Sequence, residues 1–150
     1  MKTIIVITLI LIDFFSKKII FNYIELNQII FINPFLDFTH IHNYGISFGL
    51  FAGTLPAWLI ALLGIIITIF LYFWMIKTDN EIEKIGILLI ISGAISNIGD
   101  RILNNYVLDF IFLHYNNFYW PAFNFADIYI SIGIILVIIE SYRMFKKKNK

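Results

Sequence analysis

The stretch AWLIALLGIIITIFLYFWMI, residues 57–76, contains twenty residues and no charge. Twenty apolar residues form about 30 Å of α-helix, which matches the hydrocarbon core of a bilayer. Trp58 and Trp74 lie near its two ends, where aromatic rings favour the membrane–water interface. We therefore predict a helix over 57–76 that crosses a membrane.

The rest of the chain has the same apolar character. Of 150 residues, 60% are hydrophobic and 14% are charged, whereas soluble domains average about 45–50% and about 25%. This length predicts a single membrane domain covering residues 1–150. Cysteine is absent, which excludes disulfides, thiol catalysis and Cys-ligated metals. The net charge of +1 implies no nucleic-acid partner.

Three more apolar stretches are long enough to cross a bilayer, at residues 3–22, 85–103 and 122–142. Pro121 is suited to open the last of them. We predict an all-α integral membrane protein with four transmembrane helices. Small residues in 85–103 would let that helix approach its neighbours closely.

An acid and a base lie inside the first predicted helix. Asp13 and Lys17 are four residues apart and share one helix face. Because an isolated acid inside a membrane is costly, we expect the two to pair. The alternative is that Lys17 and Lys18 extend to the membrane surface instead.

Two polar segments separate the predicted helices, at residues 23–56 and 104–121. The first is interrupted by turn-forming residues such as Asn33 and Pro34, and its pattern partly alternates over 35–43. We expect a small extracytoplasmic β-element there, between the first and second helices.

The basic residues predict the orientation in the membrane. Eight of the eleven Lys and Arg residues lie at the N-terminus, in 77–84 or in the tail after 142, and the two polar segments hold none. Cytoplasmic loops carry the excess of Lys and Arg. Both termini are therefore expected in the cytoplasm, with the polar segments on the outer face.

Two short blocks supply carboxylates at this outer face: VLDFI at 107–111, which contains Asp109, and FNFAD at 123–127, which contains Asp127. Two adjacent carboxyl groups do not ionise independently, and one keeps a proton at neutral pH. The ionised group can then accept a proton from water while the other donates one. This chemistry hydrolyses a peptide bond without a metal.

Asn43, Asn97 and Asn124 supply amide groups in short blocks that are expected at the same membrane face, and Arg101 supplies a fixed positive charge. They could hold a substrate backbone and stabilise developing charge. A structural interpretation is open for each: Asn124 as a helix cap, and Arg101 as the ion-pair partner of Asp100.

Other functions remain open on these residues. Intramembrane acids also occur in transporters, although this chain has no internal repeat. A metallopeptidase could use His40, His42 and His114, but the usual helical zinc motif is missing. A purely structural membrane subunit is a further alternative. A presenilin-type protease would show a Gly-x-Gly-Asp motif, which is absent.

The polar blocks together resemble lipoprotein signal peptidase, the bacterial signal peptidase II family. The resemblance covers nearly the whole chain, with five blocks in the family's order. They are DFFSK at 13–17, NYGISF at 43–48, GAISNIGDR at 93–101, VLDFI at 107–111 and FNFAD at 123–127.

This resemblance implies an aspartic endopeptidase of the bacterial inner membrane. Its substrates would be prolipoproteins whose Cys carries diacylglycerol, cut just before that Cys. Asp109 and Asp127 would be the catalytic pair. No metal or cofactor is implied, membrane lipid is the surrounding partner, and we expect a monomer. The positions that match the family's other site residues are Asn43, Asn97, Arg101, Asn124 and Asp13.

Overall fold

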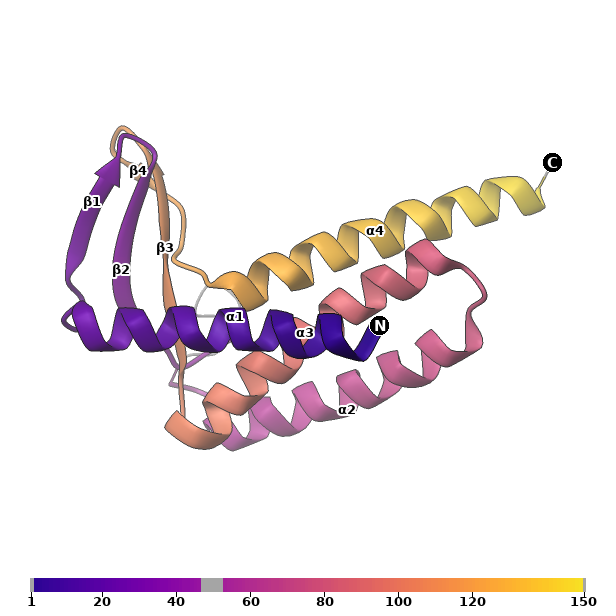
Figure 1. Cartoon of the computed structure of the whole chain (residues 1–150), viewed down its shortest axis with the longest axis horizontal. Helices are drawn as coiled ribbons and strands as arrows, with labels where there is room; N and C mark the ends of the chain where they lie inside the picture. The colour runs from indigo at the N-terminus through magenta and orange to yellow at the C-terminus, as the bar shows by residue number, and fades with distance from the viewer. Residues whose placement is uncertain (1, 47–52, 150) are drawn as a thin grey trace.

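The computed structural model describes residues 2–46 and 53–149. The helices lie side by side, and a sheet stands at one end of them (Figure 1). The helices are α1 (Lys2–Tyr23), α2 (Ala57–Lys77), α3 (Glu81–Asn104) and α4 (Phe125–Lys148). The strands are β1 (Ile29–Asn33), β2 (Leu36–Asn43), β3 (Val107–Tyr115) and β4 (Phe118–Tyr119). Helix α3 is central, since it contacts each of the other three helices.

Among the described residues, three helices are long and apolar enough to cross a membrane: α2, α3 and α4. Much of their aliphatic surface is exposed, as expected for side chains that face lipid. Helix α1 is of similar length but carries Asp13, Lys17 and Lys18. The predicted count of four transmembrane helices therefore exceeds the three that length and composition support.

The sheet is larger than the sequence predicted, and the fold is mostly helical rather than all-α. Its antiparallel strands lie in the order β1-β2-β3-β4, so the sheet joins residues from both polar segments. In the central pair, Ile41 lies opposite Asp109 and Asn43 opposite Val107. Strand β3 was missed because residues 107–111 are all buried, and a strand buried on both faces has no apolar alternation.

Helix α4 begins at Phe125, and not at residue 122 as predicted. Phe123 is extended because its backbone pairs with β3: its N–H donates to Ile111 at 3.0 Å, and its carbonyl accepts from Ile111 at 2.8 Å. Asn124 then caps the helix. The pairing brings the start of α4 beside β3.

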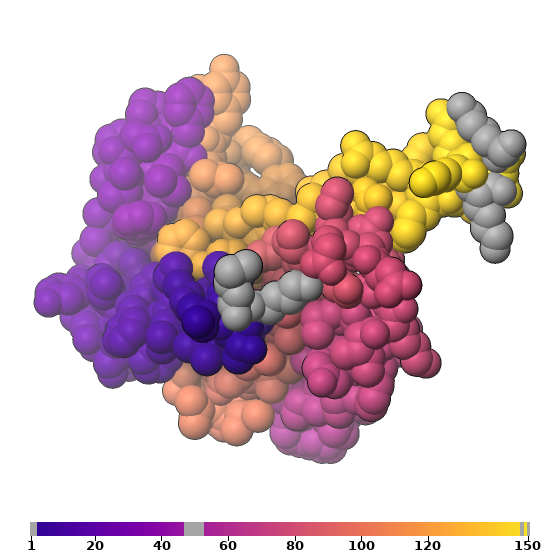
Figure 2. Space-filling view, turned by 45° about the vertical axis from the view of Figure 1, so that its right-hand side comes forward, coloured from indigo at the N-terminus to yellow at the C-terminus, as the bar shows by residue number. Residues whose placement is uncertain are grey.

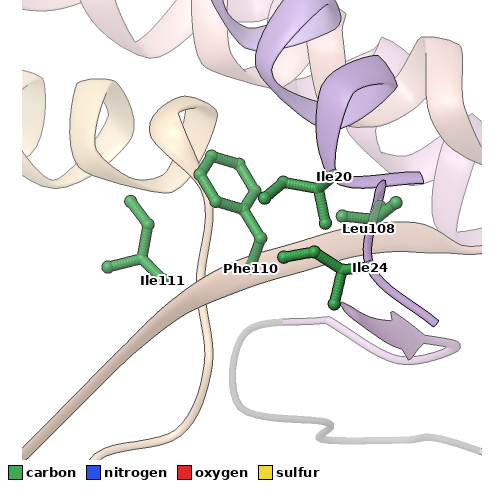
Figure 3. Packing of buried hydrophobic residues seen from close by; sticks show 5 residues of the cluster. All are labelled: Ile20, Ile24, Leu108, Phe110 and Ile111. Carbon is green, nitrogen blue, oxygen red and sulfur yellow. The ribbon is translucent and has the colours of Figure 1, made fainter. Parts of the chain in front are cut away.

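An apolar cluster fixes the sheet against the helices. Ile20 of α1 and Ile24, directly after that helix, lie beside Leu108 and Phe110 of β3, and Ile111 completes the cluster (Figure 3). Successive residues of a strand point to opposite faces. Since Leu108 and Phe110 face α1, Asp109 between them faces the other way.

Helices α3 and α4 approach closely through glycines, as the small residues of 85–103 predicted. A Cβ atom on Gly133 would lie 2.5 Å from the carbonyl oxygen of Gly86, and one on Gly93 would collide with the carbonyl of Ala126. This approach places the middle of α3 against the first turn of α4. The C-terminal part of α4 projects beyond the other helices (Figure 2).

Candidate active site

Asp109 lies on β3 with only 3% of its surface exposed. Asn43, at the end of β2, donates from Nδ2 to its Oδ2 at 2.9 Å. Asn124 donates from Nδ2 to its Oδ1 at 2.7 Å. Each carboxyl oxygen therefore has an amide donor, as a buried carboxyl group requires.

Asp127 is the third residue of α4 and forms a capping box with Asn124. The Asp127 N–H donates to Oδ1 of Asn124 at 3.0 Å, and the Asn124 N–H donates to Oδ2 of Asp127 at 3.3 Å. Asn97 of α3 donates to Oδ1 of Asp127 at 2.9 Å. Asn124 is thus both a helix cap and a contact of the two acids.

The surroundings of Asp109 change its acidity. Burial, followed by the negative charge of Asp127, raises the pKa of Asp109 from 3.8 to about 7, although the hydrogen bonds from Asn43 and Asn124 oppose the shift. The carboxyl group of Asp109 therefore exchanges its proton near neutral pH. Such a group is suited to acid–base catalysis.

Arg101 holds the segment that follows β2. Its Nη2 donates to the carbonyl of Gly45 at 2.7 Å, and its Nη1 donates to the carbonyl of Asn97 at 3.0 Å. The alternative ion pair between Arg101 and Asp100 does not form, because Asp100 pairs with Lys17 at 2.7 Å. Arg101 also lines a cavity that contains the two acids.

Asp13 is fully buried and pairs with Lys17 at 2.6 Å, which confirms the predicted pair. Its Oδ2 also accepts from Oγ of Ser96 at 2.5 Å, and its Oδ1 accepts the N–H of Ala126 at 2.9 Å. Ala126 directly precedes Asp127. Asp13 therefore connects α1 and α3 to the first turn of α4. Among the described hydrogen bonds, none joins Asp13 to Asp109 or Asp127.

Lys17 extends this network beyond what the sequence suggested. Its Nζ donates to Oδ1 of Asn97 at 3.1 Å, and the Nδ2 of Asn97 donates to Asp127. The spacing of Asp13 and Lys17 indicated their pair, but nothing in it indicated the contact of Lys17 with α3. Ser96 was also missed, because a helical serine usually bonds its own backbone.

Two apolar cavities meet at the acids. One, of about 300 Å³, lies between α2 and α3 and is lined by side chains such as Leu63 and Ile98. The other, of about 460 Å³, lies along α4 and β3 and is lined by side chains such as Ile128 and Trp120. Asn43, Asp109 and Asp127 line both cavities. A ligand that enters either cavity therefore reaches the same pair of carboxyl groups.

The three histidines do not converge. His40 and His42 contact each other on β2, whereas His114 of β3 lies 3.4 Å from Asp37. Within residues 2–46 and 53–149 there is no group of three or more His, Cys, Asp or Glu placed to hold a metal ion. The arrangement of a metallopeptidase site is thus not found in the described part of the chain.

Comparison with known proteins places this arrangement in a family. The family described as signal peptidase (SPase) II matches residues 5–143. A lipoprotein signal peptidase of Wigglesworthia glossinidia brevipalpis is 40% identical, over 92% of this chain and 94% of its own. One from Teredinibacter turnerae is 38% identical, over 88% and 81%.

Solved structures agree with the sequences. A bacterial membrane enzyme determined by the in meso method at 2.3 Å resolution matches with a TM-score of 0.89 and 30% identity, covering 98% of this chain and 90% of that one. A second, at 1.9 Å resolution, matches with a TM-score of 0.82 and 31% identity, covering 93% and 90%.

The fold and these matches define a multi-pass bacterial membrane protein of the aspartic peptidase class. The chain belongs to the signal peptidase II family, the family of lipoprotein signal peptidases. It is a peptidase that removes signal peptides.

Proposed function

We propose that this peptidase cleaves diacylglyceryl-modified prolipoproteins immediately before the lipid-modified Cys, with Asp109 and Asp127 as its catalytic pair. The observation that carries the proposal is the position of the two acids. They are joined through Asn124 and lie where two apolar cavities meet. A substrate with an acyl-bearing Cys and an apolar signal helix has an apolar part on each side of its scissile bond.

The electrostatics favour different roles for the two acids. Asp109, whose pKa is raised to about 7, carries the proton and donates it to the scissile carbonyl oxygen. Asp127 is favoured as the ionised member, because it lies in the first turn of α4, where the helix dipole stabilises a negative charge. Asp127 accepts a proton from water, and the resulting hydroxide attacks the carbonyl carbon. When the C–N bond breaks, Asp127 returns that proton to the leaving amine, and the former carbonyl oxygen returns its proton to Asp109.

The other polar residues orient the two carboxyl groups and stabilise charge beside them. Asn43 and Asn97 each donate to one acid and fix its orientation. Arg101 holds the backbone at Gly45 and lines the cavity beside the acids, where its charge stabilises the negative charge that develops on the carbonyl oxygen before Asp109 protonates it. Asp13 supports the start of α4 from behind.

The same arrangement supports the proposed placement in the membrane. The N-terminal end of α1, the α2–α3 connection and the C-terminal end of α4 all lie away from the sheet (Figure 1). These are the basic parts of the chain, which favours their position in the cytoplasm. Helix α1 then forms a fourth span whose Asp13 and Lys17 are buried against α3, and the acids lie toward the outer face. A diacylglyceryl group holds its Cys at that depth, since each buried CH₂ contributes about 0.8 kcal/mol.

The substrate is tested with the purified enzyme in detergent. A prolipoprotein is offered with and without diacylglycerol on its Cys, and the mass of each product is measured. We expect a product that begins at the lipid-modified Cys, and no cleavage of the unmodified protein. Equal cleavage of both proteins, or a cut at another bond, would contradict the proposed specificity.

The enzyme works alone in this proposal, as a monomer without nucleic acid, so activity should coelute with the monomer in size-exclusion chromatography.

A further inference from the structure

His40 and His42 lie two residues apart on β2, so their side chains share one face of the strand. Their Nε2 atoms are 3.1 Å apart. Neither histidine contacts Asp109 or Asp127 through a described hydrogen bond, and neither has a role in the proposed reaction. The pair lies in the extracytoplasmic part of the proposed topology.

The distance between the two nitrogens suits a shared metal ion. Zn²⁺ binds imidazole nitrogen at about 2.0–2.1 Å. Two such ligands are therefore about 3.4 Å apart at a tetrahedral angle and about 2.9 Å apart at a right angle. The separation of 3.1 Å lies between these values. A shift of a few tenths of an ångström is enough to admit an ion between the rings.

The hydrogen on the His40 ring is also placed so that Nε2 can bind a metal ion. The Nδ1 of His40 lies 2.8 Å from the carbonyl oxygen of Ile24. A carbonyl only accepts, so Nδ1 carries the hydrogen and Nε2 has a free lone pair. A backbone carbonyl on the second ring nitrogen is a usual partner of a metal-binding histidine. In the metal-free protein, Nε2 of His42 donates to Nε2 of His40. When an ion binds, the proton of His42 moves to its Nδ1, and the Nε2 lone pair then faces the ion.

Both rings are held in position before any ion binds. His40 is 4% exposed, and His42 stacks on Tyr106 with 3.5 Å between ring centroids.

We propose that His40 and His42 form a chelating site for one divalent transition-metal ion of the Zn²⁺ type, separate from the catalytic acids. Imidazole nitrogen suits Zn²⁺ and Cu²⁺ rather than Mg²⁺ or Ca²⁺. Within the described residues no third His, Cys, Asp or Glu completes the group, so water fills the remaining positions. The site lies next to Asn43, a contact of Asp109, but supplies no group to the reaction.

The test is equilibrium dialysis of the purified enzyme, prepared with a histidine-free affinity tag, against Zn²⁺. We expect one Zn²⁺ per chain. His42→Phe keeps a ring against Tyr106, and His40→Asn keeps a donor toward Ile24, yet each removes one ligand. Each should weaken Zn²⁺ binding by more than about tenfold, since even the loss of an outer-shell contact costs 10–100-fold.

His114→Gln is the matched control, because it removes the third histidine and keeps a donor toward Asp37. It should leave Zn²⁺ binding unchanged. Absence of Zn²⁺ binding by the natural enzyme would overturn the site and leave only a hydrogen bond between the rings. The same conclusion would follow if the His40→Asn and His42→Phe proteins, shown to be folded by their thermal melting curves, bound Zn²⁺ as tightly as the natural enzyme. The metal-free enzyme should still cleave its substrate, so this result is independent of the proposed function.

Discussion

The side-chain amide of Asn124 donates a 2.7 Å hydrogen bond to Oδ1 of Asp109. Its oxygen accepts the backbone N–H of Asp127 at 3.0 Å, so the amide cannot turn over without losing both bonds. Asn124 therefore fixes the carboxyl group of β3 relative to the first turn of α4. This relationship unites a helix cap, which the sequence suggested, with a contact that only the fold creates.

Replacing Asn124 separates these two roles. Asn124→Ala removes the cap, worth about 1 kcal/mol, and the donor to Asp109. A hydrogen bond to the neutral carboxyl group contributes about 0.5–1.5 kcal/mol, so kcat should fall about two- to tenfold. Asn124→Ser restores a cap but not the donor. It should recover the melting temperature without recovering kcat, and recovery of both would contradict the role assigned to the amide.

The raised pKa of Asp109 predicts the pH dependence of cleavage. A carboxyl group with a pKa of about 7 loses its proton as the pH rises through 7, so kcat/KM should fall above that pH. Asn43→Ala removes a hydrogen bond that lowers this pKa. The alkaline fall in the Asn43→Ala enzyme should therefore occur at higher pH. A pH–rate profile of each enzyme measures the pH at which kcat/KM falls. If this pH is the same for the natural and the Asn43→Ala enzymes, the alkaline fall is not due to Asp109.

The same shift has a consequence for stability. The unfolded carboxyl group ionises near 3.8 and the folded one near 7, so the folded state binds the proton more tightly. The free energy of unfolding should then decrease as the pH rises from about 4 to about 7. Melting temperatures across this range should show the decrease for the natural enzyme and a smaller one for Asp109→Asn.

Lys17 is predicted to be structural. Its Nζ pairs with Asp13 at 2.6 Å and with Asp100 at 2.7 Å. Lys17→Met leaves these buried acids without their partner, which costs about 3–5 kcal/mol for a buried pair. Lys18→Met alters an exposed neighbour and should change the melting temperature little. Similar melting temperatures for the two variants would show that the buried pairs contribute little.

The contact between α3 and α4 can be tested with a matched pair of glycine variants. A Cβ on Gly93 would collide with the carbonyl of Ala126, whereas one on Gly99 meets nothing within 4 Å. Gly93→Ala should destabilise the protein by about 1–3 kcal/mol through overpacking. Gly99→Ala should be neutral or stabilising by up to about 1 kcal/mol, from helix propensity. Thermal melting in one detergent compares them, and equal effects would contradict the close helix contact.

The sequence predicted those features that depend on local spacing. The four-residue interval of Asp13 and Lys17 predicted their ion pair. The apolar run of 57–76 predicted α2 almost to the residue. A helix cap was one interpretation of Asn124, and Asn124 is the N-cap of α4.

The features that depend on distant pairing were not predicted. Asp109 lies in a strand because β2 pairs with β3, and the register of that pairing has no local signal. The late start of α4 follows from the backbone bonds between Phe123 and Ile111. The interval between Asp13 and Lys17 likewise gave no sign that Lys17 reaches Asp100 and Asn97 on another helix.

The catalytic assignment of Asp109 and Asp127 is tested most directly by the cleavage rate of one lipid-modified prolipoprotein in the presence of a strong chelator. The natural enzyme is compared with Asp109→Asn and Asp127→Asn, after melting curves establish that all three are folded. Acid–base groups contribute about 10²–10⁴-fold each, so both variants should lose at least about a hundredfold in kcat while the natural enzyme is unaffected by the chelator. A folded variant that retains near-natural turnover would contradict the account, as would loss of natural activity on chelation.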